Sequence, residues 1–348
     1  MNPEFDGIDG PYIVGEKIYR VTKNKKLISA QLETTDSIDV TVDNVDHDQF
    51  SFSLRKEYDL ERSSYPMPKK LIVIADIEGN FNGFLSFLVG NKVVDLNLNW
   101  IFESNHLLLC GDLIDRGIYA TQVLWLVYKL EQEAAEKGGK VHLILGNHEI
   151  MNFQGNVRYN HEKYIKVALE ISGKERPDRA VQFMFSDKTE LGKWLRTKNV
   201  IKKIGDYIFV HAGLHPEILE YDLNLEEINE QTRASWDTHL YTDEKVDEVA
   251  NFLTGNKCLY WYRGLATDHR HYDKIHENEL NKILDYYRAK KIVIGHTVVD
   301  DISTDFNGKV VKIDILHEQD KNTGLTKGLL IENGIQYKVN DKGHRETF

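Results

Sequence analysis

The chain has 348 residues, of which 41% are hydrophobic and 28% charged, the composition of an ordinary soluble globular protein. The formal net charge is −11, and no cluster of Lys and Arg alternates with aromatic residues, which argues against broad binding to nucleic acids or anionic membranes. No segment reaches the roughly 20 apolar residues of a membrane span. Two cysteines, Cys110 and Cys258, provide no disulfide framework, and the acidic residues 1–10 do not resemble a signal peptide, so we expect a cytoplasmic protein.

The first part of the chain reads as β-rich. Short strand-like runs are broken by Gly, Asn and Asp, and two prolines, Pro66 and Pro68, precede the first strongly apolar strand. We therefore predict a β-rich accessory segment over residues 1–66, followed by a core domain over residues 67–348. The predicted strands of the accessory segment lie within 12–21, 26–33, 37–42 and 50–54.

From residue 70 the pattern changes to strand, loop and helix, which favours a layered α/β core. Polar helical stretches without strands, near 156–200 and 216–256, are predicted to be insertions at one edge of a sheet. The tail again reads as strands and is predicted to complete a second sheet. The apolar strands of the core lie at 71–75, 106–110, 141–145, 207–210 and 291–295, the main helices at 81–88, 120–139 and 278–291, and the tail strands at 309–316, 327–333 and 335–341.

Each of the five core strands ends in side chains that can bind a metal. We expect the five ends to share one sheet, where open α/β sheets bind ligands. Taken alone, Asp76 and Glu78 could be ligands of a hard cation, an acid/base pair or a polar turn. The side chains that follow the strands are Asp76 and Glu78, then Asp112, Asp115 and Arg116, then Asn147, His148 and Glu149, then His211, and finally His296.

The set mixes carboxylate and amide oxygens with imidazole nitrogens. Such a mixture suits a pair of divalent transition ions better than a calcium site, which takes oxygen ligands only. A carboxylate can bridge two such ions, which activate hydroxide and stabilise a phosphoryl group under in-line attack.

The motifs "ADIEGN", "GDLIDRG", "GNHE", "HAG" and "GHT" occur in the order found in calcineurin-like metallophosphoesterases, and the chain resembles the phosphoprotein phosphatase branch of that superfamily. "GNHEIMNFQGNVRY" and "LYWYRG" are most similar to its bacterial Shewanella-like protein phosphatases. The resemblance covers roughly residues 70–316. It implies a four-layer αββα sandwich, joined here to the β-rich N-terminal segment.

The resemblance also implies a role for each matching residue. Asp112 bridges two divalent ions, His148 is the general acid for the leaving alkoxide, and Asp115 orients His148. Arginines hold the phosphate oxygens because the planar guanidinium matches their geometry. The implied ligands are Asp76 at metal one and Asn147, His211 and His296 at metal two, and the phosphate-binding arginines are Arg116, Arg263 and, less directly, Arg158.

One position departs from the family pattern, because Glu78 stands where the first motif has a histidine. Glu78 could bind metal one through oxygen, giving a site with a preference for harder ions such as Mn²⁺. Alternatively, it could point away and leave metal one weak, or it could mark a member that binds phosphate compounds without turnover. We expect the first outcome, since Glu is a competent ligand and the other motifs are whole.

The sequence therefore predicts a hydrolase, a dinuclear-metal phosphatase that cleaves phosphomonoesters by direct attack of a metal-bridging hydroxide. Its substrate would be a phosphorylated small molecule or a phosphoprotein carrying phosphoserine, phosphothreonine or phosphotyrosine, and no nucleic acid or membrane partner is expected. Mn²⁺ is the favoured metal, with Fe, Zn, Ni or Mg as other choices. The alternatives are a hydrolase of dinucleoside polyphosphates or small phosphodiesters, and a catalytically silent phosphate-binding scaffold.

Overall fold

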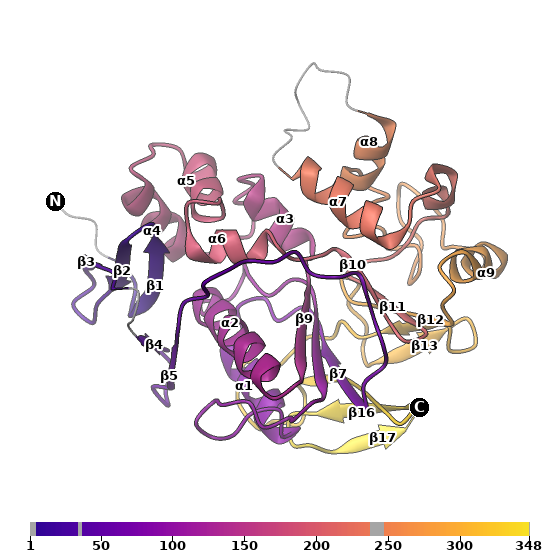
Figure 1. Ribbon diagram of the computed structural model, residues 1–348, viewed down its shortest axis with the longest axis horizontal. Coiled ribbons are helices and arrows are strands. Elements are labelled where there is room, and N and C mark those ends of the chain that lie inside the picture. Colours follow the sequence, from indigo (N-terminus) through magenta and orange to yellow (C-terminus); the bar gives the residue numbers. More distant parts are fainter. Residues whose placement is uncertain (1–4, 34–36, 237–246, 348) are drawn as a thin grey trace.

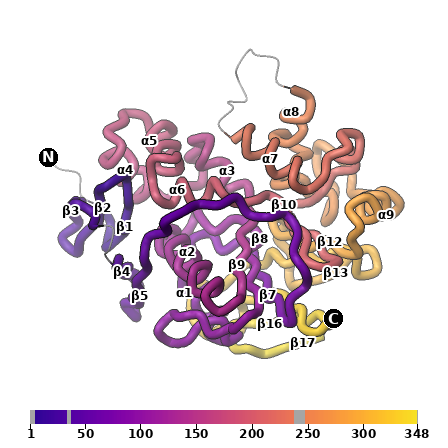
Figure 2. The backbone as a smooth tube through the Cα atoms, in the orientation of Figure 1, coloured from indigo at the N-terminus to yellow at the C-terminus, as the bar shows by residue number. Residues whose placement is uncertain are grey.

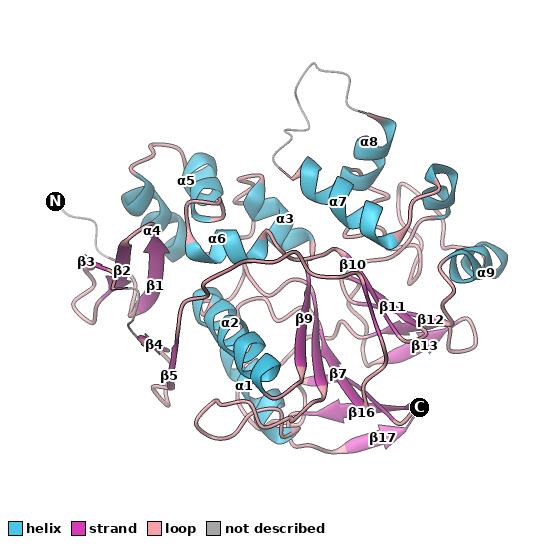
Figure 3. Ribbon diagram, in the orientation of Figure 1, coloured by secondary structure: helices cyan, strands magenta, loops and turns pink. Residues whose placement is uncertain are grey.

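The structure, a computed structural model, describes residues 5–33, 37–236 and 247–347 (Figure 1). Two six-stranded sheets lie at its centre, and helices cover their outer faces (Figure 3). The first sheet has the order β17 (Arg345–Thr347), β16 (Ile335–Asn340), β15 (Lys327–Glu332), β7 (Lys70–Ile74), β8 (His106–Cys110) and β9 (Lys140–Ile144). The second has the order β13 (Ser303–Asp305), β14 (Val310–Lys312), β12 (Lys291–Ile294), β11 (Tyr207–Val210), β10 (Ile201–Ile204) and β6 (Ser64–Tyr65).

The strands β7, β8, β9, β11 and β12 are apolar on both faces because both of their faces are buried, whereas the edge strands β13 and β17 are polar and more exposed. In β7, Leu71 and Val73 join a core cluster shared with residues of the second sheet, such as Val293. The alternate residues Ile72 and Ile74 belong to a different cluster, together with apolar residues of the covering helices. This alternation confirms the layered α/β sandwich that the sequence predicts.

Helices come from the loops between strands and from the two predicted insertions. α1 and α2 follow β7 and β8, and both contribute residues to the core cluster on the outer side of the first sheet. The helices are α1 (Phe81–Gly90), α2 (Ala120–Glu136), α3 (Asn147–Phe153), α4 (Glu162–Ser172), α5 (Pro177–Met184), α6 (Glu190–Leu195), the 3₁₀ helix η1 (Pro216–Tyr221), α7 (Leu225–Ser235), α8 (Glu248–Thr254) and α9 (Glu277–Tyr286). Residues 237–246 of the second insertion lie outside the described residues, as do residues 1–4.

One prediction about the sheets is wrong. The five metal-competent strand ends do not share one sheet: β7, β8 and β9 lie in the first and β11 and β12 in the second. The tail is also divided, since β14 pairs with β12 whereas β15 inserts beside β7 with Leu329 opposite Val73. Strand order depends on such long-range pairing, which the local sequence pattern does not encode.

The N-terminal residues form the expected strands and pack on the core. Phe52 stacks on Trp125 of α2 with ring centroids 4.2 Å apart. A strap, residues 53–63, then crosses the molecule from β5 towards β6 (Figure 2). The strands are β1 (Asp9–Val14), β2 (Lys17–Val21), β3 (Leu27–Gln31), β4 (Ile38–Thr41) and β5 (Gln49–Phe52). The domain boundary at residue 66 stays a prediction.

Within the described ranges, none of the helices combines the length and the apolar character that crossing a membrane requires.

Candidate metal centre and active site

The predicted site residues meet where the carboxyl ends of β7, β8 and β9 in one sheet lie beside those of β11 and β12 in the other. Asp112, two residues after β8, lies with its Oδ2 3.1 Å from Nε2 of His211, which directly follows β11 in the other sheet. Asp76, two residues after β7, accepts a hydrogen bond of 3.1 Å from the backbone N–H of His296, which follows β12. One donor atom each from Asp112, His211 and His296 lies within 4.8 Å of the others.

The backbone of this edge is strained at the residues that carry the chemistry. A positive φ is rare for residues other than glycine and costs about 1 kcal/mol or more, so such residues tend to gather at functional sites. Close approach also requires two glycines, because a Cβ at Gly111 would overlap the ring of His211 and one at Gly146 would overlap the carboxylate of Asp112. The strained site residues are Asp76 (54°), Glu78 (49°), Asp112 (54°), Asp115 (72°), Arg116 (54°) and His296 (62°).

The two histidines present nitrogens suited to binding a metal. Nδ1 of His211 lies 2.8 Å from the carbonyl oxygen of Cys110, which can only accept, so Nδ1 carries the proton. Its Nε2 is 3.1 Å from Oδ1 of Asn147, the amide of the third strand end. Nε2 of His296 is buried and has no hydrogen-bond partner among the described residues, while burial, His211 and Arg263 lower the pKa of that imidazole. A neutral imidazole whose buried nitrogen has no hydrogen-bond partner is suited to bind a cation.

Asp112 is the charged centre of the cluster. Burial alone would raise the pKa of Asp112, but the imidazoles of His211 and His148 hold that pKa well below its ordinary value. Asp112 also accepts a hydrogen bond of 2.9 Å from the backbone N–H of His148. An ionised carboxylate with donors on both sides suits the bridging position that the resemblance implies.

His148 and Asp115 form a buried pair beside Asp112. Nδ1 of His148 lies 2.7 Å from Oδ2 of Asp115, and Nε2 of His148 lies 3.7 Å from Oδ2 of Asp112. Burial alone would lower the pKa of His148, but Asp112 and Asp115 raise it overall. Asn152 donates to both oxygens of Asp115 at 3.1 and 3.2 Å, and Asn160 also donates to this carboxylate. Nothing in the local sequence pattern marks these two asparagines as partners of Asp115.

The three predicted phosphate-binding arginines lie at this edge in different surroundings. Arg116 and Arg158 lie over the ring of Tyr159, at 5.4 and 5.2 Å from its centroid, and this ring is 5.0 Å from that of His148. Arg263 donates to the backbone oxygen of His296 at 2.5 Å. Tyr159 therefore belongs to the site, although the sequence analysis did not select it; its only signal was its place directly after Arg158.

Glu78, the residue that departs from the family pattern, is turned towards the cluster. An oxygen of Glu78 lies within 4.8 Å of donor atoms of Asp112 and His148, and Glu78 also forms an ion pair with Arg116. Burial raises the pKa of Glu78, although Arg116 opposes this. The side chain can thus reach a cation beside Asp112, and its role as a ligand stays a prediction.

Asp314 is a further acidic residue of the site, which sequence reasoning read only as part of a tail strand. It lies two residues after β14, is 4% exposed, and shares a groove of about 520 Å³ with Asp76 and Glu78. Burial, followed by the charges of Glu78 and Asp112, raises the pKa of Asp314 to about 7, despite the opposing effect of His211. Burial, Asp314 and Asp112 likewise raise the pKa of Asp76. Such mutual repulsion is relieved when a cation binds.

The residues present therefore fit two divalent cations. At one position Glu78, Asp112 and His148 bring ligand atoms within 4.8 Å of one another, and at the other Asp112, His211 and His296 do so. Asp76 lines a groove with Glu78, and Asn147 lies beside His211. The donor set of the second contains the neutral, orphaned Nε2 of His296.

Comparison with known proteins shows the family to which the chain belongs. Residues 69–300 match the family model described as calcineurin-like phosphoesterase. The chain is 32% identical to Shewanella-like protein phosphatase 1 of Plasmodium berghei over 66% of this chain, and the match spans only 61% of that protein. It is 25% identical to Shewanella-like protein phosphatase 2 of Arabidopsis thaliana over 92% of this chain and 89% of the other. The crystal structure of a cold-active protein-tyrosine phosphatase from a psychrophilic Shewanella superposes with a TM-score of 0.84 at 30% identity, covering 98% of this chain and 99% of that one.

Proposed function

The chain belongs to the calcineurin-like phosphoesterase family, and we propose that it is a metal-dependent protein phosphatase acting on phosphotyrosine in preference to phosphoserine or phosphothreonine. The observation that carries the proposal is the cluster of donor atoms from Asp112, His211 and His296 beside the His148–Asp115 pair. The cluster offers a cation site and the pair offers a proton donor. Hydrolysis of a phosphate ester without an activated leaving group uses both.

Two divalent ions, Mn²⁺ in our proposal, occupy the site in the working enzyme. When bound, they supply the Lewis acidity that makes water a nucleophile at neutral pH and neutralises charge on the phosphoryl group. Asp76, Glu78 and Asp112 would hold the first ion, and Asp112, Asn147, His211 and His296 the second.

His148 acts as the general acid. Asp115 receives the Nδ1–H of His148, so the proton available for the leaving oxygen is the one on Nε2. Asn152 and Asn160 donate to Asp115 and thereby keep its carboxylate turned towards the imidazole. Because His148 and Asp115 are already held in place, they need not reorganise when the proton moves.

Arg116, Arg158 and Arg263 receive the phosphate. Arg116 would exchange its ion pair with Glu78 for the phosphate oxygens, which its planar guanidinium can bind in a bidentate manner. Tyr159 supports both Arg116 and Arg158 through its ring.

The preference for phosphotyrosine is supported by the groove beside the acidic residues. Three exposed aliphatic side chains line it, namely Ile118 (42% exposed), Val298 (52%) and Leu316 (81%). An aromatic ring that carries the phosphate could pack on these side chains, whereas the short side chain of phosphoserine could not reach them as well. The Shewanella neighbour named a protein-tyrosine phosphatase supports the same choice.

The proposal is tested by comparing three substrates with Mn²⁺ present: a phosphotyrosyl peptide, the same peptide with phosphoserine, and diadenosine tetraphosphate. We expect the highest kcat/KM for the phosphotyrosyl peptide. A higher value for diadenosine tetraphosphate would instead establish a nucleotide-directed hydrolase, and the absence of turnover with every divalent metal would favour the silent scaffold.

A matched variant identifies the source of the activity. His148→Asn should retain Mn²⁺ because His148 is not among the proposed ligands, while kcat falls by about 10²–10⁴-fold through loss of the general acid. Unchanged kcat in this variant would remove His148 from the mechanism.

A further inference from the structure

The register of β14 against β12 places Asp314 beside the proposed metal centre. β12 and β14 are parallel neighbours with Ile294 opposite Lys312. His296 and Asp314 each lie two residues beyond this last pair, and the backbone bond from Ile313 N–H to the Ile294 oxygen, at 2.9 Å, continues the pairing past the strand ends. Asp314 therefore emerges beside His296, whose own N–H bonds Asp76.

Among the described residues, the carboxylate of Asp314 has no hydrogen-bond or ion-pair partner. The backbone oxygen of Asp314 accepts a hydrogen bond of 2.9 Å from Val299, but throughout residues 5–33, 37–236 and 247–347 no donor or cation reaches its side chain. The residue is nevertheless only 4% exposed. Burying a carboxylate without hydrogen bonds or a counter-charge destabilises the folded state.

The charges of His211 and Arg263 oppose the rise in the pKa of Asp314, but among the described residues no ion pair joins either of them to its carboxylate. Asp76 and Glu78 line the same groove, and Arg116, which also lines it, is already paired with Glu78. Three carboxylates thus share one arginine around this groove. A bound cation is the simplest partner for the two that the arginine does not contact.

We propose that Asp314 is a ligand of metal one and that, together with Asp76, Glu78 and Asp112, it makes this ion's protein ligands entirely carboxylate. The inference rests on the proposed function, because it assumes that the centre binds two ions. It assigns Asp314 the compensating role for the histidine that Glu78 replaces. Oxygen ligands alone make metal one a harder site than metal two, which has imidazole nitrogens.

The test is a calorimetric titration of the full chain with Mn²⁺ after chelator treatment. The parent should bind two ions. Asp314→Asn should weaken one of them at least tenfold and leave the other unchanged, whereas His296→Asn should weaken the other. Asp320→Asn, which removes an exposed carboxylate six residues further along, is the charge-matched control and should match the parent at both sites.

Thermal unfolding of the metal-free variants separates a ligand from a structural residue. Asp314→Asn should unfold no earlier than the parent, because it removes an unpaired buried charge, but Mn²⁺ should raise its Tm by less. Asp314→Glu, which keeps the charge, should recover part of the lost affinity.

Unchanged affinity at both sites in Asp314→Asn would overturn the inference while leaving the proposed function intact. An earlier metal-free Tm with unchanged affinity would likewise overturn it and make Asp314 structural. A parent chain that binds no Mn²⁺ would overturn the proposed function itself, before any variant is compared.

Discussion

Two buried groups of charged residues in this molecule differ in how their charges are balanced. The metal-facing edge holds Asp76, Glu78 and Asp314 around one arginine, Arg116, and the pKa of each of these carboxyl groups is raised, first by burial. The second group, which we call the ion network, joins Arg55 and Glu61 of the strap to Glu131, Lys198 and Lys202.

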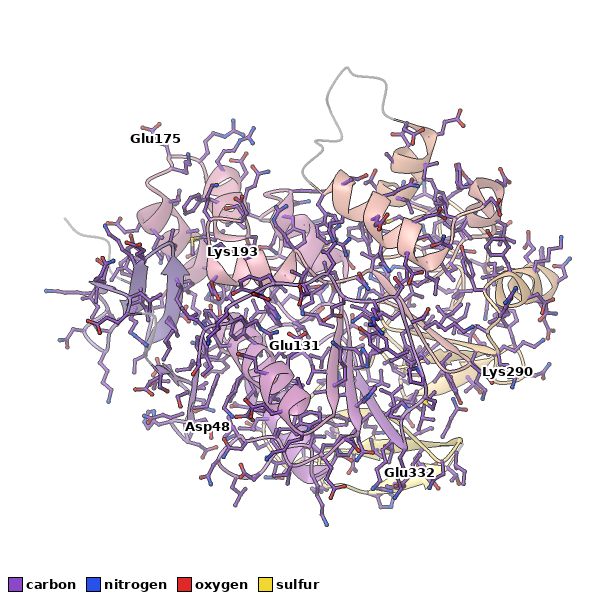
Figure 4. All side chains as sticks on the ribbon, viewed as in Figure 1. Asp48, Glu131, Glu175, Lys193, Lys290 and Glu332 are labelled. Atoms are coloured by element: carbon purple, nitrogen blue, oxygen red, sulfur yellow. The ribbon has the colours of Figure 1, made fainter. Side chains whose placement is uncertain are left out.

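In the ion network every carboxylate has a cation. Lys198 lies 2.6 Å from Glu131 and 2.8 Å from Glu61, Arg55 lies 2.7 Å from Glu131, and Lys202 contacts Glu61. Burial alone would raise the pKa of Glu131, but Lys198 and Arg55 lower it overall. Figure 4 shows Glu131 in the interior, whereas Lys290 and Glu332 lie at the periphery.

The two groups differ in role according to whether each carboxylate contacts a cation. A buried network in which each carboxylate contacts a cation holds the strap on α2 and β10. The unmatched carboxylates of the metal-facing edge cost folding free energy, and in our proposal cation binding is their function. The predictions below test this contrast.

Removing the shared carboxylate should have the largest effect. Asp112→Asn should lose tight binding of both ions, and kcat/KM should fall by at least about 10³-fold, because the neutral amide cannot bridge two cations. Metal analysis and initial rates measure this. Retention of two ions with parental activity would show that Asp112 does not bridge.

Breaking the ion network should affect stability and spare the site. Lys198→Met removes the cation that contacts both Glu131 and Glu61 and leaves each carboxylate with one cation, Arg55 or Lys202. The free energy of unfolding should therefore fall by about 1.5–3 kcal/mol, with Mn²⁺ content unchanged. Chemical denaturation measures the difference. Lys290→Met is the control, because its ion pair with Asp206 is exposed and should contribute less than about 1 kcal/mol. Loss of Mn²⁺ in Lys198→Met would contradict the proposal that the ion network stabilises the fold without affecting the metal site.

Asp115→Asn should change the pH dependence of catalysis. The protonated form of His148 is the active one, and Asp112 and Asp115 raise its pKa, so activity is lost as the pH rises through that value. Without the charge of Asp115 the alkaline limb of the pH–rate profile should move to lower pH, and kcat should fall by about 10²-fold. An unshifted alkaline limb would mean that another group titrates there.

The smallest effect should come from changing one of the exposed aliphatic side chains that line the groove, Ile118, Val298 and Leu316. Leu316→Ser should reduce kcat/KM about fivefold for a phosphotyrosyl peptide, equivalent to about 1 kcal/mol of lost apolar contact, and leave the phosphoseryl peptide unaffected. Leu96→Ser, at another exposed leucine (84% exposed), is the control. Equal losses on both peptides would argue against recognition of the ring.

The strand ends could be predicted from the sequence because their signal is local. Short apolar runs that end in a polar side chain, often after Gly, identify residues such as Asp76, Asp112 and His296 without knowledge of strand order. Which sheet each strand joins could not be predicted, because that depends on pairings such as Leu329 with Val73, which are more than 250 residues apart.

Asp314 and the ion network were missed for the same physical reason. Asp314 lies in a strand-like tail, and only the register of β14 against β12 brings it to the metal centre. Glu131 and Lys202 carry charges that normally mark exposed positions, and their burial depends on the strap and on each other.

The central claim is that the unmatched carboxylates form a two-metal centre for phosphate ester hydrolysis. It is tested most directly by adding Mn²⁺ in known equivalents to the chelator-treated full chain and recording both the bound metal and the initial rate on a phosphotyrosyl peptide. The account predicts that the rate reaches its plateau at two bound ions per chain. Full turnover by the metal-free chain, or two bound ions without any turnover, would contradict it.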